Sequence, residues 1–248
     1  MTDDQGRIRE PGVPAEAAPA PTGGFFQSIV DVFVDPYKVF GRIDAGLSWW
    51  KPFILVAVVV MIISYVTLPL QRKLMELRMQ NLGEEQVQNA AEQFGKWAPI
   101  GLVMVPITLI IVYLVYAAIA HLVINIMSTR SSFKKTLCLT VFCSVITIVE
   151  QIIGTIVVMM RGPESIESAA DIRFTLSLAP LVGEGKGLLS AVLQSLSIFQ
   201  IWYYVVLTLG IAAIFKMSRK AAIIPVLLIW IIGVIFILIG GKIGGGLG

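Results

Sequence analysis

The chain has 248 residues, of which 56% are hydrophobic and only 14% are charged, and its mean hydropathy is +0.84. This composition is too apolar for a soluble globular domain, so we expect an integral membrane protein. The formal net charge of +3 is spread over short polar segments and forms no concentrated basic patch, so we expect no nucleic acid partner.

The first 24 residues contain Asp, Glu, Pro, Ala and Gly but almost no large apolar side chain. Such a segment cannot bury enough surface to offset the entropy lost on ordering. We therefore expect residues 1–24 to form a disordered cytoplasmic tail that contains neither a signal peptide nor a lipidation motif.

Apolar residues recur at helical spacing from Phe25 to Val34 and predict an amphipathic helix. Asp35 and Pro36 then favour a second short helix, because Asp caps helix N-termini and Pro is tolerated at the first helical position. We expect residues 25–51 to lie along the cytoplasmic headgroups, with Trp49 and Trp50 as interfacial anchors. The alternative is that these residues pack on the helix bundle itself.

Five apolar runs are of membrane-spanning length, since about 20 helical residues cross a hydrocarbon core of ~30 Å. They lie at about 52–70, 98–127, 136–160, 188–215 and 221–240. Residues 71–97 are too polar to span and predict a helical excursion on the far side, broken near Asn81 and Gly83. Pro106 is expected to kink the second span, and the Gly-rich residues 241–248 are expected to form a flexible tail.

Two short connections between spans are basic and contain no acid. Their cations are Arg130, Lys134 and Lys135 in the first, and Lys216, Arg219 and Lys220 in the second. The positive-inside bias places both connections in the cytoplasm, with the N-terminus inside and the C-terminus outside, and we expect a bacterial inner membrane. The same cations are candidates for contact with anionic lipid or an acidic partner; the alternative is that they only determine topology.

Three stretches carry a family resemblance. They are Asp35-Pro-Tyr-Lys-Val-Phe40 with Trp50-Lys-Pro-Phe53, then Ser132-Phe-Lys-Lys-Thr-Leu137, and finally Phe199-Gln-Ile-Trp202 with Lys216-Met-Ser-Arg-Lys-Ala221 and Trp230. In this order they resemble the Yip domain family of multi-spanning membrane proteins, in particular its bacterial branch; eukaryotic members interact with Ypt/Rab GTPases. The resemblance covers residues 25–240 and implies five helical spans, binding to partner proteins and no catalysis. One departure is Ser144-Val-Ile-Thr147, where many relatives have a proline after the serine.

Glu150 is the one acidic residue inside a predicted span, 14 residues into the third and therefore ~21 Å from its inner end. An ionisable group at this depth is a functional candidate, because burying it charged is costly. His121 and Asn125 share a face of the second span closer to the inner side, so direct pairing with Glu150 is not expected. Gln194 adds a polar side chain in the fourth span. These residues are either polar ties between helices or part of a proton- or solute-coupled path.

We expect neither a metal nor a cofactor. Cys138 and Cys143 lie in one apolar segment and are expected to be buried hydrophobic side chains, and a single histidine completes no metal-ligand set. The sequence therefore favours an all-α, non-enzymatic membrane scaffold or adaptor that binds other membrane proteins or lipids, with homo-oligomerisation left open. The alternative is a small transporter or channel with Glu150 as its polar site, although the chain shows neither the internal repeat nor the matching helix breaks common in transporters.

Overall fold

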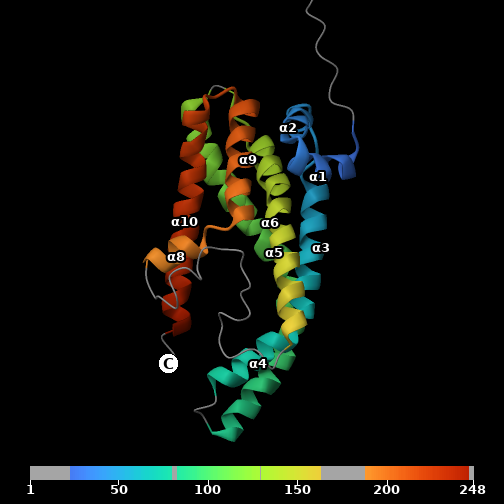
Figure 1. Cartoon of the computed structure of the whole chain (residues 1–248), viewed down its shortest axis with the longest axis vertical. Helices are drawn as coiled ribbons and strands as arrows, with labels where there is room; N and C mark the ends of the chain where they lie inside the picture. The colour runs from blue at the N-terminus through green and yellow to red at the C-terminus, as the bar shows by residue number, and fades with distance from the viewer. Residues whose placement is uncertain (1–22, 80–82, 129, 163–187, 246–248) are drawn as a thin grey trace, which may run out of the picture.

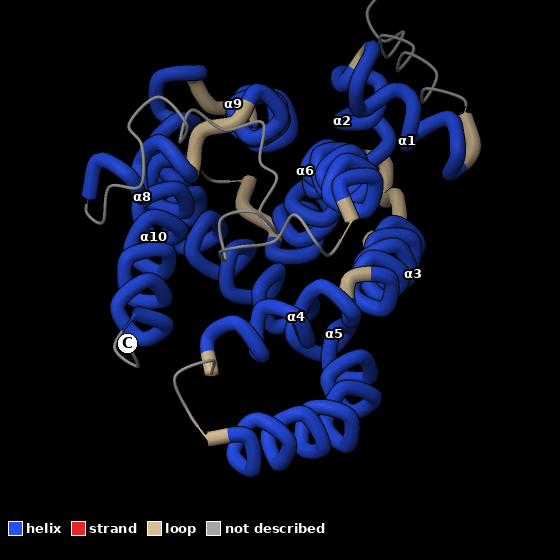
Figure 2. Tube along the Cα trace, turned by 60° about the horizontal axis from the view of Figure 1, so that its bottom comes forward, coloured by secondary structure: helices blue, strands red, loops and turns tan. Residues whose placement is uncertain are grey.

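The computed structural model describes residues 23–79, 83–128, 130–162 and 188–245, and every regular element in these ranges is a helix (Figures 1 and 2). The helices are α1 (Phe25–Val34), α2 (Pro36–Asp44), α3 (Trp50–Val66), α4 (Leu68–Arg78), α5 (Glu84–Met127), α6 (Phe133–Arg161), α8 (Leu188–Gln194), α9 (Ile198–Phe215) and α10 (Arg219–Gly245). The predicted tail at residues 1–24 lies outside the described residues except for Gly23 and Gly24.

Among the described residues, α5, α6, α9 and α10 are each long and apolar enough to cross a membrane. The consecutive helices α3 and α4 form a fifth span if they are counted together, with a bend of 48° between them. The predicted fold class, an all-α polytopic membrane protein, is therefore confirmed, and the number of spans agrees with five when this bent pair crosses as one.

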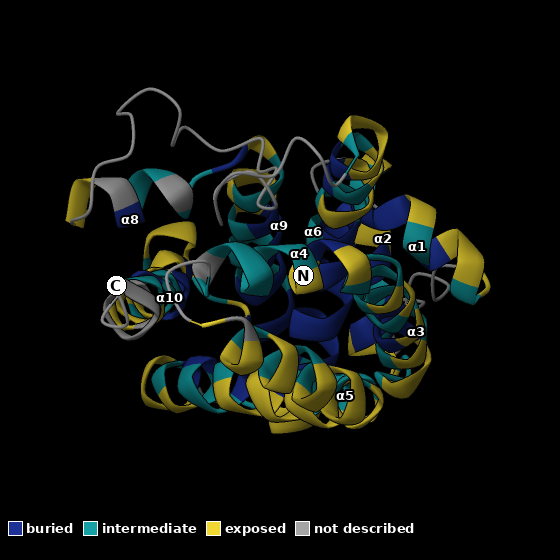
Figure 3. Ribbon diagram, turned by 90° about the horizontal axis from the view of Figure 1, so that it is seen from below, coloured by how far each residue is buried: buried dark blue, intermediate teal, exposed yellow. Residues whose placement is uncertain are grey.

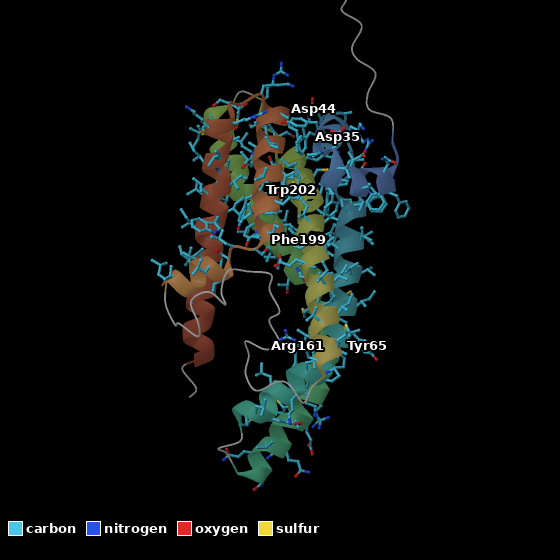
Figure 4. All side chains as sticks on the ribbon, viewed as in Figure 1. Asp35, Asp44, Tyr65, Arg161, Phe199 and Trp202 are labelled. Atoms are coloured by element: carbon cyan, nitrogen blue, oxygen red, sulfur yellow. The ribbon has the colours of Figure 1, made fainter. Side chains whose placement is uncertain are left out.

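The bundle has two distinct ends. Helices α1 and α2 lie at one end, beside the connections from α5 to α6 and from α9 to α10, which we call the basic end (Figure 1). Helix α4 and the first turns of α5 lie at the opposite end. Asp35 and Asp44 mark the basic end in Figure 4, whereas Tyr65 and Arg161 mark the opposite one.

Helix α5 is longer than the span predicted at 98–127. It begins at Glu84 and continues for 44 residues, ~66 Å at the usual helical rise, so it extends well beyond a hydrocarbon core. The predicted excursion at 71–97 is thus divided between α4 and this extension. Pro99 and Pro106 both lie inside the helix, which is continuous through both residues. A kink at Pro106 stays a prediction.

The predicted fourth span, 188–215, is not one helix. It is divided into α8 and α9 by residues 195–197, and α8 lies across the side of α10 (Figure 1). The physical reason is local capping: the Ser197 hydroxyl accepts a 3.0 Å hydrogen bond from the Gln200 amide and so begins a new helix.

Part of the Gly-rich segment at 241–248 is helical, and residues 246–248 lie outside the described residues. Helix α10 continues to Gly245, five residues beyond the predicted end of the fifth span at 240. Hydropathy marks where a helix leaves the apolar layer, and backbone hydrogen bonding can continue past that point.

The core is centred on α6, which contacts α2, α3, α5 and α9. One buried cluster joins α2, α6 and α9, with Phe40, Phe142 and Phe215 among its largest side chains. A second cluster joins α6 to α3 and α5 around Val56 and Tyr113. Figure 3 shows these inward faces as buried, whereas most of the outer surface of α5 is exposed.

Candidate functional site

A cavity in the half of the bundle away from the basic end contains Glu150 of α6. Helix α6 begins at Phe133, so Glu150 lies ~26 Å along it, level with the first turn of the shorter helix α9. The Ser197 hydroxyl donates a 2.7 Å hydrogen bond to the Glu150 carboxylate while its oxygen caps α9. The N-terminus of α9 therefore lies beside this carboxylate.

The polypeptide between α8 and α9 is tied to α10 by a second serine. The Trp230 indole donates a 2.9 Å hydrogen bond to the Ser195 hydroxyl, which donates a 2.7 Å bond to the Val192 carbonyl. Both serines are thus fully engaged in holding the break between the two helices in place.

The cavity has a volume of about 620 Å³, within the range of small-molecule sites. Its polar side comprises Thr147, Glu150, Gln151, Ser195, Ser197 and Gln200. Its remaining wall is apolar and aromatic, with Tyr116 and Val115 from α5, Tyr204 from α9, and Trp230 and Phe236 from α10. Four separate helices therefore contribute to one site.

Glu150 has no ion-pair partner among the described residues, and no Lys, Arg or His is among the cavity lining. Its Oε2 accepts the hydrogen bond from the Ser197 hydroxyl. The cavity therefore presents a carboxylate whose counter-charge the described side chains around it do not supply.

The other intramembrane candidates do not join this site. His121 packs edge-to-face against Phe133, with its Nδ1 buried and without a hydrogen-bond partner in the described part of the chain. Asn125 accepts a 2.5 Å hydrogen bond from Ser131 near the basic end. The side chain of Gln194 lies outside the described residues. As expected, Glu150 and His121 do not pair.

The basic end brings the predicted cations together through specific contacts between its two connections. Ser128, after α5, donates a 2.8 Å hydrogen bond to the carbonyl of Phe215 at the end of α9. Lys135 forms a 2.5 Å ion pair with Asp44 of α2. Arg130, Lys134, Lys216, Arg219 and Lys220 are exposed and form no ion pair among the described residues.

Helix α1 is held at this end by its polar face. Asp31 is buried and forms a 2.6 Å ion pair with Arg42 of α2, while Gln27 donates a 2.9 Å hydrogen bond to the same carboxylate. The hydrogen bond from Gln27 and the adjacent Arg42 guanidinium lower the pKa of Asp31 below its ordinary value. The apolar edge of α1 consequently faces outward, and Phe26 and Val34 are 79% and 78% exposed.

The alternative that residues 25–51 pack on the bundle holds for α2, whereas a position of α1 along the headgroups stays a prediction. The apolar side chains of α2, Val39, Phe40 and Ile43, are buried in the bundle core, whereas those on the outer edge of α1 are open to the surroundings. Trp49 packs against the core, and Trp50 is half-exposed at the start of α3 with Lys51 above its ring. A role of the tryptophans as interfacial anchors stays a prediction.

Sequence reasoning missed Ser197, which positions Glu150, and the roles of Gln200, Tyr204 and Trp230 in the cavity. A signal was present: Gln194-Ser-Leu-Ser197 is a polar interruption in a long uncharged run, and serine is a preferred N-cap. The cysteines agree with expectation, since Cys138 and Cys143 are free and buried. Within the described ranges, no group of His, Cys, Asp and Glu is arranged to hold a metal ion.

A family model of the Yip1 domain matches residues 30–240. The chain belongs to the Yip1 domain family. Both the α1–α2 unit and the Glu150 cavity lie largely within this Yip1 domain, and the resemblance drawn from the sequence is confirmed. The membrane protein YknW of Bacillus subtilis (strain 168) is 29% identical over 223 residues, which cover 87% of this chain and 90% of that protein. No solved structure matches the chain.

Proposed function

We propose that this Yip1 domain protein is a non-enzymatic membrane scaffold or adaptor that binds other membrane proteins or lipids at its basic end. The observation that supports the proposal best is the gathering of exposed cations from two connections far apart in sequence. Arg130 and Lys134 come from the first connection, and Lys216, Arg219 and Lys220 come from the second. The Ser128 to Phe215 hydrogen bond holds these connections side by side.

The chemistry of this surface suits an anionic partner at a membrane. Each Lys or Arg near an anionic surface contributes about 1 kcal/mol of attraction, and the positive-inside bias places this end in the cytoplasm. The exposed apolar edge of α1, around Phe26 and Val34, would lie at the level of the headgroups beside the cations. A lipid headgroup or an acidic segment of another membrane protein would then contact both features.

The test is affinity purification of the tagged protein from its native membrane, with mass spectrometry of the proteins and lipids that accompany it. A variant with Lys216, Arg219 and Lys220 changed to Glu is expected to lose most of its associated protein or anionic lipid. A control with Arg72, Lys73 and Lys96 changed to Glu makes the same charge change elsewhere and should retain them. Unchanged association in the first variant, with membrane topology verified, would remove the basic end from the proposal.

A second candidate function, a small transporter or channel, is supported by the break between α8 and α9. The sequence showed no matching breaks of the transporter kind, but the structure has this one beside an acidic residue, Glu150, at membrane depth. This candidate predicts pH-dependent solute or proton flux in liposomes that Glu150→Gln abolishes. Equal flux in the variant and the wild type would reject it.

A further inference from the structure

The Glu150 cavity combines an anionic group with a large apolar wall, a combination suited to an amphiphilic cation. The carboxylate is fixed at one side by Ser197 at 2.7 Å. The wall around the carboxylate is apolar and aromatic: Val115 and Phe236 are apolar, and Tyr204 and Trp230 present aromatic rings. Aromatic faces attract cations, and an apolar chain is driven out of water by contact with such a wall.

The Ser and Thr hydroxyls of the lining each have a hydrogen-bond partner, and Glu150 is the charged residue in the described part of the lining. Ser195 bonds with Trp230 and the Val192 carbonyl, Ser197 with Glu150 and the Gln200 amide, and Thr147 with the Ser144 carbonyl. A calcium or magnesium ion needs about six oxygen ligands, more than this arrangement leaves free. A single organic cation needs one carboxylate.

We propose that this cavity binds a primary alkylammonium ion, with its ammonium group on the Glu150 carboxylate and its alkyl chain along the apolar wall. An ammonium donates charge-assisted hydrogen bonds to a carboxylate and supplies the counter-charge that the described lining residues do not provide. A zwitterionic headgroup fits less well, because the described lining contains no Lys, Arg or His to face its phosphate. This inference goes beyond the scaffold proposal and does not depend on it, since the basic end and the cavity share no residue.

The experiment is equilibrium dialysis of radiolabelled octylammonium against the full chain in phosphatidylcholine nanodiscs. Empty nanodiscs provide the correction for partitioning into lipid. We expect saturable binding of about one ion per chain, and a loss of about 10-fold or more in affinity for Glu150→Gln, whose amide oxygen still accepts from Ser197. Glu92→Gln, which removes an exposed acid from α5 outside the cavity, should bind as the wild type does.

A second variant tests the apolar wall independently of the charge. A Cβ atom at Gly233 of α10, a lining residue, would meet no atom within 4 Å, so Gly233→Leu is expected to extend a side chain into the cavity space. We expect this variant to keep the thermal stability of the wild type and to bind octylammonium several-fold more weakly. If Glu150→Gln does not fold, Gly233→Leu still tests the proposal.

Matched ligands separate the contributions of the alkyl chain, the ammonium charge and an added phosphate to binding. Octanol has the same chain without the charge, octanoate reverses the charge, and a lysophosphatidylethanolamine adds a phosphate to the ammonium group. Saturable binding of octylammonium alone, weakened in both cavity variants, would support the proposal. Equal binding of octanol, undiminished binding to Glu150→Gln, tighter binding of the lysophospholipid, or no saturable binding would overturn it.

Discussion

The Arg42 guanidinium donates a 2.6 Å hydrogen bond to Oδ2 of Asp31 and a 3.0 Å bond to the Ser28 hydroxyl, with 5% and 6% of the two charged side chains exposed. This buried pair joins α1 to α2 across 11 residues of sequence. It holds the face of α1 that carries Ser28, Asp31 and Val32 against the bundle and leaves the edge with Phe26 and Val34 exposed.

Removal of one member of this pair should destabilise the protein strongly. Asp31→Ala removes the carboxylate that bonds to both Arg42 and Gln27, and the loss of charge-assisted hydrogen bonds of this kind typically lowers the free energy of unfolding by about 1.5–3 kcal/mol. Denaturant unfolding of the purified protein measures the loss. The matched control is Asp35→Ala, because the Asp35–Lys38 pair is exposed and should contribute less than about 1 kcal/mol. Similar losses in the two variants would contradict this account of the pair.

The same pair predicts a dependence of stability on acid pH. The pKa of Asp31 is lowered from its ordinary value of 3.8, chiefly by the Gln27 hydrogen bond and also by Arg42. A carboxylate whose pKa is lower in the folded state than in the unfolded state stabilises the protein fully when the pH is above the unfolded-state pKa. This stabilisation is lost as the pH falls through the folded-state pKa. The wild type should therefore lose more stability than Asp31→Asn between neutral pH and about pH 3. Parallel melting-temperature profiles of the two proteins would show that Asp31 is not the titrating group.

Gly210 allows α9 to approach both α6 and α2. A Cβ atom there would lie 2.5 Å from Cδ1 of Leu139 and 2.9 Å from Cε1 of Phe40, and both of these side chains are buried. Gly210→Ala should therefore reduce the free energy of unfolding by about 1–3 kcal/mol through overpacking. Gly101→Ala in α5, where nothing lies within 4 Å, should be neutral or slightly stabilising because Ala favours helix. Thermal unfolding of both variants provides the comparison.

Lys216 ends α9 in the left-handed conformation, with φ 54° and ψ 40°, and is the one described non-glycine residue with positive φ. The Met217 amide bonds to the Ala212 carbonyl, as in a Schellman ending, in which glycine is preferred. Lys216→Gly should therefore raise the free energy of unfolding by about 1 kcal/mol while removing a cation from the basic end. If the scaffold proposal holds, this more stable variant should bind its partner more weakly. Stronger or equal partner binding would argue against a role for Lys216.

Hydropathy alone predicted the membrane class and the approximate positions of the spans, because long apolar runs have few other stable environments. It did not predict the break at 195–197, since neutral Ser residues barely lower the hydropathy of a run, and the break depends on hydrogen bonds made by their hydroxyls. The start of α5 at Glu84 was missed for a related reason: a helix continues wherever its backbone bonds are satisfied, inside or outside the membrane.

The candidate site was predictable only in part. Glu150 was identifiable as an acid in an apolar run, and the cations of the basic end were identifiable from their spacing. The partners were not: Ser197 lies 47 residues from Glu150, and Arg42 lies 11 residues from Asp31. Because helical periodicity describes one helix at a time, it cannot show which face meets which neighbour.

The most direct test of the scaffold proposal is photo-crosslinking in the native membrane from each end of the bundle. A photoreactive amino acid replaces the exposed Ser218, between α9 and α10, or the exposed Gln88 near the start of α5. The proposal predicts a specific crosslink to a partner membrane protein or anionic lipid from position 218, lost when Arg219 and Lys220 are changed to Glu, and none from position 88. A specific partner crosslinked from position 88 alone would contradict it.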